Sequence, residues 1–124
     1  MAKDIIHNPV KNAQVIQYRT LIKQLLSEHA TLANSAPTTE RESHVIFDEE
    51  HDRYMLFRTG WWGNERVNAP TLYVRLHNGK IWIEEDMTEE GLATDLLRVG
   101  VPNNKIVLAF HHPTIRPFTE FAVA

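Results

Sequence analysis

Apolar and polar residues follow a helical period over the first part of the chain. Between residues 9 and 33 the apolar positions recur at intervals of three and four, which predicts one amphipathic helix. Asn8 is placed to cap this helix, and Pro9 suits its first turn. The polar stretch 34–42 predicts the loop that ends it. The residues of the predicted apolar stripe are Val15, Ile16, Tyr18, Ile22, Leu25, Leu26, His29 and Leu32.

The pattern then changes to short runs that are typical of strands. Two such runs flank a charged turn at residues 48–52, and the second, residues 54–57, is apolar on both faces. A strand of this kind normally lies inside a sheet with a layer packed on each side. We expect helices to form one layer and a second subunit to form the other, which predicts a homo-oligomer. Residues 60–70 are predicted to be a connection, with one of Trp61 and Trp62 in the core.

The clearest local signal is the dipeptide Asn78-Gly79 between two alternating runs. It predicts a hairpin, because a type I′ turn needs positive φ at both central residues. A two-residue turn also fixes the register of the strands. The predicted opposite pairs are His77 with Lys80, Leu76 with Ile81, Arg75 with Trp82, Val74 with Ile83, and Tyr73 with Glu84. In this register Leu72, Val74, Leu76, Ile81 and Ile83 form the inner face, and Tyr73, Arg75, Trp82 and Glu84 form the outer one.

A second helix is predicted over residues 88–99. Thr88 or Asp86 can cap its start, and Gly100 supplies the left-handed residue that ends it. Residues 106–110 then predict a short buried strand. The order α-β-β-β-β-α-β predicts an α+β two-layer sandwich, in which an antiparallel meander sheet carries two helices on one face. Residues 1–124 form one domain in this interpretation.

Composition limits the function classes. An apolar content of 43% and a charged content of 23% are ordinary for a soluble domain. The chain has neither a membrane-length apolar run nor the apolar core of a secretory signal near its start, which predicts a cytoplasmic protein. The lack of cysteine excludes disulfides, thiol nucleophiles and zinc–thiolate sites. A net charge of −3 with scattered Lys and Arg disfavours direct nucleic-acid binding.

The last third of the chain carries motifs that resemble the XisI family, the fdxN element excision controlling factors. These motifs are GKIWI at residues 79–83, GVP at 100–102 and the closing TEFAVA at 119–124. Tyr18, Tyr54 and Gly60-Trp61 extend the resemblance over nearly the whole chain. The chain departs from the family pattern before the third strand, where Asn68-Ala69-Pro70 replaces a Tyr-Gly-Cys-like segment, and at the junction between strand and helix.

The resemblance implies an accessory role beside a site-specific recombinase in developmentally programmed DNA excision. It also implies a companion, XisH, whose relatives resemble restriction-type nucleases. No catalytic residue follows from it. We therefore predict a non-enzymatic protein, with neither cofactor nor metal, that binds or restrains a XisH-like partner.

We expect the partner to contact the outer hairpin face and an ordered C-terminal tail. Tyr, Trp and Arg dominate the binding energy of many interfaces. An alternative for Trp82 is a surface residue shielded by Arg75 through a cation–π contact. Arg116 and Glu120 either form a salt bridge that orders the tail or bind the partner. The candidate contact residues are Tyr73, Arg75, Trp82, Glu84, Asp86, Arg116 and Glu120.

The carboxylates that follow the hairpin offer a second function class. Glu84 and Asp86 are predicted to share one strand face, with Glu89 at the start of the helix beyond. Such a cluster could hold Mg²⁺ in a small metal-dependent enzyme. A capped helix start with solvated charges explains the same residues more simply. The chain also lacks the Glu-x-Lys and Asp-x-Lys patterns of restriction-like nucleases, and the adjacent His111 and His112 would face opposite ways on a strand.

Overall fold

The computed structural model of the protein describes residues 9–36, 38 and 40–124, so the predicted cap at Asn8 lies outside the described residues. The elements follow the predicted order and confirm the α+β sandwich. Within the described residues no helix is long and apolar enough to cross a membrane. The elements are α2 (Pro9–Asn34), β1 (Arg41–Asp48), β2 (Arg53–Trp62), β3 (Glu65–His77), β4 (Lys80–Asp86), α3 (Leu92–Arg98) and β5 (Ile106–Leu108), with 3-10 turns at Asn103–Lys105 and Arg116–Phe118.

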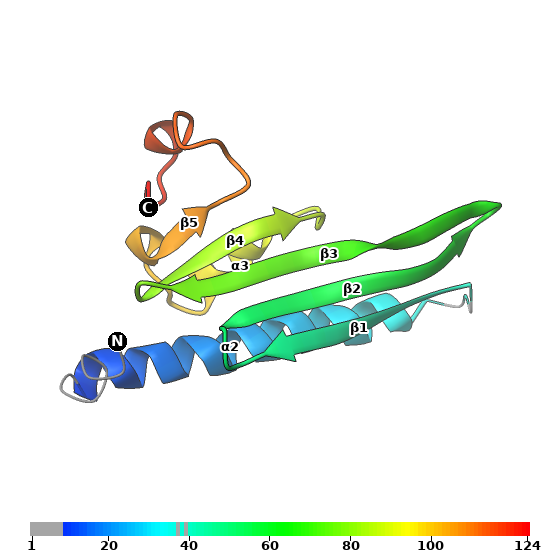
Figure 1. The fold of residues 1–124 in the computed structure, drawn as a ribbon, viewed down its shortest axis with the longest axis horizontal. Coiled ribbons are helices and arrows are strands. Elements are labelled where there is room, and N and C mark those ends of the chain that lie inside the picture. The colour runs from blue at the N-terminus through cyan, green and yellow to red at the C-terminus, as the bar shows by residue number, and fades with distance from the viewer. Residues whose placement is uncertain (1–8, 37, 39) are drawn as a thin grey trace.

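The strands form one sheet in the order β1-β2-β3-β4-β5 (Figure 1). The first four strands make the predicted antiparallel meander. β5 instead pairs with β4 in parallel, so the sheet is mixed. The reason is the crossover through α3, which returns the chain to the starting end of β4 before β5 begins.

Both helices cover the same face of the sheet (Figure 1). Between them and the sheet lies one apolar core, in which burial of a Leu or Ile side chain contributes about 1.5–3 kcal/mol. Its fully enclosed residues include Ile22 and Leu26 of α2, Leu92 and Leu96 of α3, and Tyr54, Leu72, Val74, Ile81 and Ile83 of the strands. The inner face predicted for the hairpin is therefore confirmed.

Two members of the predicted helical stripe are exposed. Ile16 is 50% exposed because it lies about 160° around the helix from Tyr18, on the side away from the sheet. Leu32 lies on the same side as Leu25 but is 71% exposed, because it lines the open groove described below. The stripe from Tyr18 to Leu26 is confirmed and Val15 also packs against the core, whereas the placement of Ile16 and Leu32 in the stripe is wrong.

The predicted hairpin register is confirmed for the four pairs nearest the turn. Asn78 and Gly79 have φ values of 52° and 73°, as a type I′ turn requires. Further along, Tyr73 lies opposite Glu85 and not Glu84, because the register shifts between Tyr73 and Val74. The extra residue on β4 is Glu84, and a β-bulge of this kind changes the side to which the following residues point.

The connection predicted over residues 60–70 is mostly strand. β2 continues to Trp62 and β3 starts at Glu65, so the two strands form a long arm that extends past the helix-covered part of the sheet (Figure 1). Gly60 serves here as a close-approach residue, because a Cβ at this position would lie 2.1 Å from the carbonyl oxygen of Glu40. Trp61 and Trp62 are 48% and 65% exposed, so the prediction that one of them is core is wrong.

The second helix and the last strand are shorter than predicted. α3 begins at Leu92 and not at residue 88, and Leu97 and Val99 of its predicted stripe are 38% and 51% exposed. Gly100, with φ of 100°, follows the helix as predicted. β5 ends at Leu108, because the N–H groups of Ala109 and Phe110 both donate to the carbonyl oxygen of Ile83 and turn the chain away.

Candidate functional site

Trp82 lies on the outer face of β4, away from the helices. Its ring faces two guanidinium groups: the terminal carbon of Arg75 is 5.2 Å from the ring centroid, and that of Arg116 is 5.6 Å away. Arg75 also donates from Nε to Glu84 Oε2 at 2.8 Å. We call these residues, Arg75, Trp82, Glu84 and Arg116, the outer-face cluster.

Arg116 belongs to the tail and fixes its path. Its guanidinium donates to three backbone carbonyl oxygens, those of His111 at 3.0 Å, Ala109 at 3.2 Å and Val123 at 3.4 Å. The N–H of Ala122 donates to Ile106 O at 2.9 Å, which lays the tail along β5. The tail is therefore ordered by backbone contacts. The salt bridge considered between Arg116 and Glu120 is not among the ion pairs of the described residues.

Tyr73, the remaining predicted residue of this face, stands apart from the outer-face cluster. Its hydroxyl accepts a hydrogen bond from Arg53 at 2.7 Å. It lines a shallow hollow over β1 and β2 together with Ile46 and Met55. The structure thus brings together four of the seven candidate residues and separates Tyr73, Asp86 and Glu120 from them.

The three carboxylates considered for a metal ion have different partners. Glu84 pairs with Arg75 on the outer face. Asp86 lies opposite Leu72 on the helix-covered side, because the bulge at Glu84 separates the two carboxylates that a regular strand would align. Its oxygens accept from the N–H of Thr88 at 2.9 Å and of Leu92 at 2.6 Å, so Asp86 caps the entry to α3. Glu89 is exposed, and the described part of the chain holds no group of three or more His, Cys, Asp or Glu placed to bind a metal.

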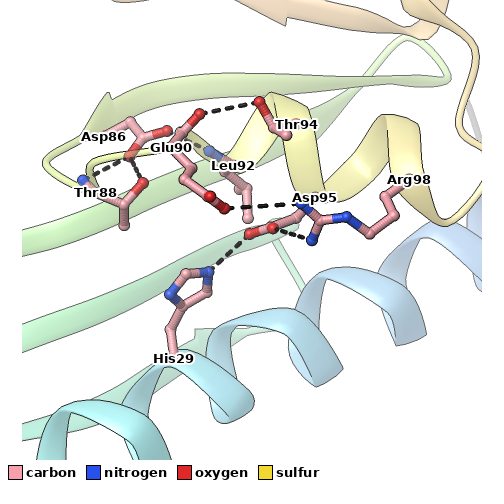
Figure 2. Close-up of polar contacts among 8 residues, drawn as sticks. All are labelled: His29, Asp86, Thr88, Glu90, Leu92, Thr94, Asp95 and Arg98. Carbon is pink, nitrogen blue, oxygen red and sulfur yellow. Dashed lines mark hydrogen bonds and ion pairs between the residues drawn. The ribbon is translucent and has the colours of Figure 1, made fainter.

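A second polar group lies between the helices (Figure 2). His29 of α2 and Asp95 of α3 are joined by a 2.9 Å contact between Nε2 and Oδ2. Because a carboxylate only accepts, Nε2 is the protonated nitrogen of the imidazole. Arg98 donates to the other oxygen of Asp95 at 3.1 Å and lies 3.7 Å from Glu90.

This group lines an open hollow of about 280 Å³, which we call the α2–α3 groove. Its walls are Glu28, His29 and Leu32 of α2, and Asp95, Arg98 and Val99 at the end of α3. A neighbouring hollow continues from His29 and Leu32 to Glu89 and Glu90. The sequence did not reveal this groove: the helical period places His29 in the core stripe, and its partner Asp95 lies 66 residues away.

The groups with shifted pKa values lie elsewhere. Burial raises the pKa of the Asp52 carboxyl, but hydrogen bonds from Arg19 and Tyr54 and the nearby Arg19 charge lower it, and the net pKa lies below its usual value. Burial and the hydrogen bond to Asp52 raise the pKa of the Tyr54 hydroxyl. Asp52 anchors the turn between β1 and β2 to α2, so these shifts belong to a structural contact.

The sequence and the fold are both similar to those of known proteins. The profile of the XisI protein family matches residues 12–123. A solved structure of fdxN element excision controlling factor XisI from Anabaena variabilis ATCC 29413 is 40% identical, with a TM-score of 0.77, over 90% of this chain and 99% of that one. A XisI-like protein of the same organism is 30% identical, with a TM-score of 0.80, over 89% and 99%. A search of curated proteins finds no match.

Proposed function

This chain belongs to the XisI family, and from that premise we propose that it is a non-enzymatic accessory protein of programmed DNA element excision. The proposal is supported by the similar structure from Anabaena variabilis, which is that of an fdxN element excision controlling factor. We expect a protein that controls excision in this way to act by binding other proteins. Two of the three carboxylates considered for metal chemistry have other partners, a guanidinium for Glu84 and backbone N–H groups for Asp86, which favours a binding function.

The outer-face cluster is the observation that carries a protein-binding role. Trp and Arg are enriched among the few residues that dominate interface energies. Here a half-buried Trp82 contacts two guanidinium groups, and backbone carbonyl oxygens of the tail hold one of them, that of Arg116, in place. Such a surface loses little conformational freedom on binding, because its side chains are already positioned.

The partner that we propose is a XisH-like nuclease, which this protein would bind or restrain. The cationic side chains of the outer-face cluster suit an acidic patch on that partner. Without such a partner this protein would have to bind DNA directly, and its net charge of −3 disfavours direct contact with phosphates.

We also propose that the protein is a homo-oligomer. On the outer side of β1 and β2, Ile46 is 49% exposed, and Met55 and Phe57 are half-buried. Neither helix covers this side (Figure 1). A second subunit packed on these strands would bury these three apolar side chains and leave the outer-face cluster on β3 and β4 for the partner.

Co-expression with the XisH-like protein encoded nearest to its gene, followed by affinity purification and light scattering, tests the proposal. We expect a complex of defined mass that Trp82→Ala and Arg75→Ala weaken by about tenfold or more. Trp62→Ala is the matched control, because Trp62 also stacks with an arginine, Arg41 at 4.3 Å, but is exposed and lies on the distant arm.

The outcomes separate the parts of the proposal. If folded Trp82→Ala and Arg75→Ala variants bind as tightly as the natural chain, the outer-face cluster is not the contact surface. If the natural chain does not co-purify with the XisH-like protein, the partner is wrong. If its mass is that of a monomer, the homo-oligomer is wrong.

A further inference from the structure

Both helices lie on one side of the sheet (Figure 1). The α2–α3 groove, which these helices line, is therefore on the side opposite the outer-face cluster. We propose that it is a second docking site, which binds a basic amphipathic helical segment of a protein partner. This inference does not depend on the XisH-like partner or on the outer-face cluster. It rests on the shape, apolar surface and charge of the groove.

The groove exposes apolar side chains where a folded helix pair would normally bury them. Leu32 is 71% exposed and Val99 is 51% exposed, and they belong to different walls. Leu25, which is only 8% exposed, lies on the same wall as Leu32, one helical turn from His29. An amphipathic helix laid across the mouth of the groove, over the His29–Asp95 contact, could contact both exposed residues with one apolar face.

The charges around these apolar residues select a basic segment. Four carboxylates surround the groove and its extension: Glu28, Glu89, Glu90 and Asp95. Arg98 supplies one opposing charge and already contacts Asp95 and Glu90. Glu28 and Glu89 are exposed and form no ion pair with any other described residue. Lysine or arginine beside an apolar face would complement this surface, whereas a nucleic acid would be repelled.

The hydrogen bond between His29 and Asp95 keeps the groove in shape. The 2.9 Å contact of His29 with Asp95 joins one wall to the other, and Arg98 holds the second oxygen of Asp95 (Figure 2). The groove is therefore formed before any partner arrives. Preformed sites bind with a smaller loss of conformational entropy.

A titration with model peptides tests this inference on the full chain. The probe is an amphipathic Leu/Lys peptide of about 15 residues, long enough to form a helix on binding, and its control is a Leu/Glu peptide with the same apolar pattern. Two-dimensional NMR of the labelled protein reports the affected residues. We expect saturable binding of the Leu/Lys peptide, with shifts confined to the second half of α2 and to α3, and none from the Leu/Glu peptide.

Variants separate the groove from general charge attraction. Leu32→Asp alters an exposed position, so the protein should stay folded, and we expect binding to weaken by about tenfold or more. Glu28→Gln with Glu89→Gln should also weaken binding. Glu49→Gln with Glu50→Gln removes the same charge from the turn between β1 and β2, and should leave binding nearly unchanged.

Three outcomes would overturn the inference. The first is no saturable binding of the Leu/Lys peptide, or equal binding of both peptides. The second is an equal loss in the two pairs of charge variants, which would mean that net charge alone attracts the peptide. The third is a concentration-dependent change of the groove signals without peptide, which would identify a second copy of the chain as the occupant.

Discussion

The helix α2 carries two carboxylate contacts that use similar chemistry and are similarly exposed but have different neighbours. Toward its N-terminal half, Arg19 binds Asp52 of the turn between β1 and β2. Toward its C-terminal end, His29 binds Asp95 of α3. Each contact joins α2 to another part of the chain, and the second opens onto a groove.

The Asp52 contact is closed in the sense that the chain itself supplies three donors to the carboxylate, although its side chain, at 23%, is no less exposed than that of Asp95, at 15%. Its two oxygens accept from Arg19 at 2.8 and 3.1 Å, and the hydroxyl of Tyr54 donates to it at 2.6 Å. Tyr54 is fully buried, and the hydrogen bonds lower the pKa of Asp52 despite the opposing effect of burial. With its partners supplied by the chain itself, this network offers little to an outside ligand.

The Asp95 contact is about equally short and no more exposed, but it is open in the sense that a groove lies beside it. It lies beside Leu32 and Val99, whose exposure exceeds half of each side chain. A short contact to a carboxylate or a shifted pKa therefore does not by itself identify a binding surface. Exposed apolar side chains beside a fixed charge do, because a partner gains both apolar burial and charge complementarity there.

The largest effect on stability should come from Asp52→Asn. Asparagine tolerates the positive φ of 51° at this position, so the backbone is preserved while the carboxylate that pairs with Arg19 is lost. We expect the free energy of unfolding to fall by about 2–3 kcal/mol, measured by urea denaturation. A loss below about 0.5 kcal/mol, typical of an exposed pair, would contradict the closed network.

The same contact should make stability depend on pH. Because the pKa of Asp52 is lower in the folded state than its unfolded value of about 3.9, its contribution is present above that value and lost as the pH falls through the folded pKa. The difference in unfolding free energy between the natural chain and Asp52→Asn should therefore shrink below about pH 4. A difference that stays constant down to about pH 2 would show that the carboxylate charge does not matter.

A smaller effect is expected from Tyr54→Phe. This change keeps the buried ring and removes the hydroxyl that donates to Asp52, while both bonds from Arg19 remain. The free energy of unfolding should fall by about 1 kcal/mol. Tyr73→Phe is the matched control, because the Tyr73 hydroxyl accepts from Arg53 in an exposed bond, and its loss should change stability very little. Equal losses in the two variants would contradict the distinction.

The fold could be predicted from local patterns where one residue type dictates one geometry. Asn78-Gly79 fixed the hairpin and four of its pairs, and the period of α2 located Tyr18, Ile22 and Leu26 in the core. The bulge at Glu84 could not be predicted, since an inserted residue leaves the alternation of neighbouring side chains ambiguous. The prediction of a connection over residues 60–70 failed because Gly60 is needed for the approach of Glu40, a contact between segments distant in sequence.

The residues of the candidate sites also differ in how far the sequence could predict their positions. Arg75, Trp82 and Glu84 could be placed together because they are close in the hairpin register. Arg116 could be assigned to the outer-face cluster only from the path of the tail, which its hydrogen bonds to three backbone carbonyl oxygens determine. His29 and Asp95 come from elements that carry no sequence signal for each other. Leu32, the most exposed residue of the groove, has the spacing of a core residue, and only the limited extent of α3 leaves it uncovered.

The smallest effect is expected at the open contact, from His29→Gln. Glutamine keeps a polar side chain at this position, and Asp95 retains its bond from Arg98 at 3.1 Å, so no charge is left without a partner. The free energy of unfolding should fall by about 0.5–1 kcal/mol in urea denaturation. Lys23→Gln, which breaks the more exposed pair with Glu49, provides the baseline. A loss of about 2 kcal/mol or more in His29→Gln would contradict this distinction between the two contacts. A side chain that contributes so much to folding would be part of the core and not the wall of a preformed groove.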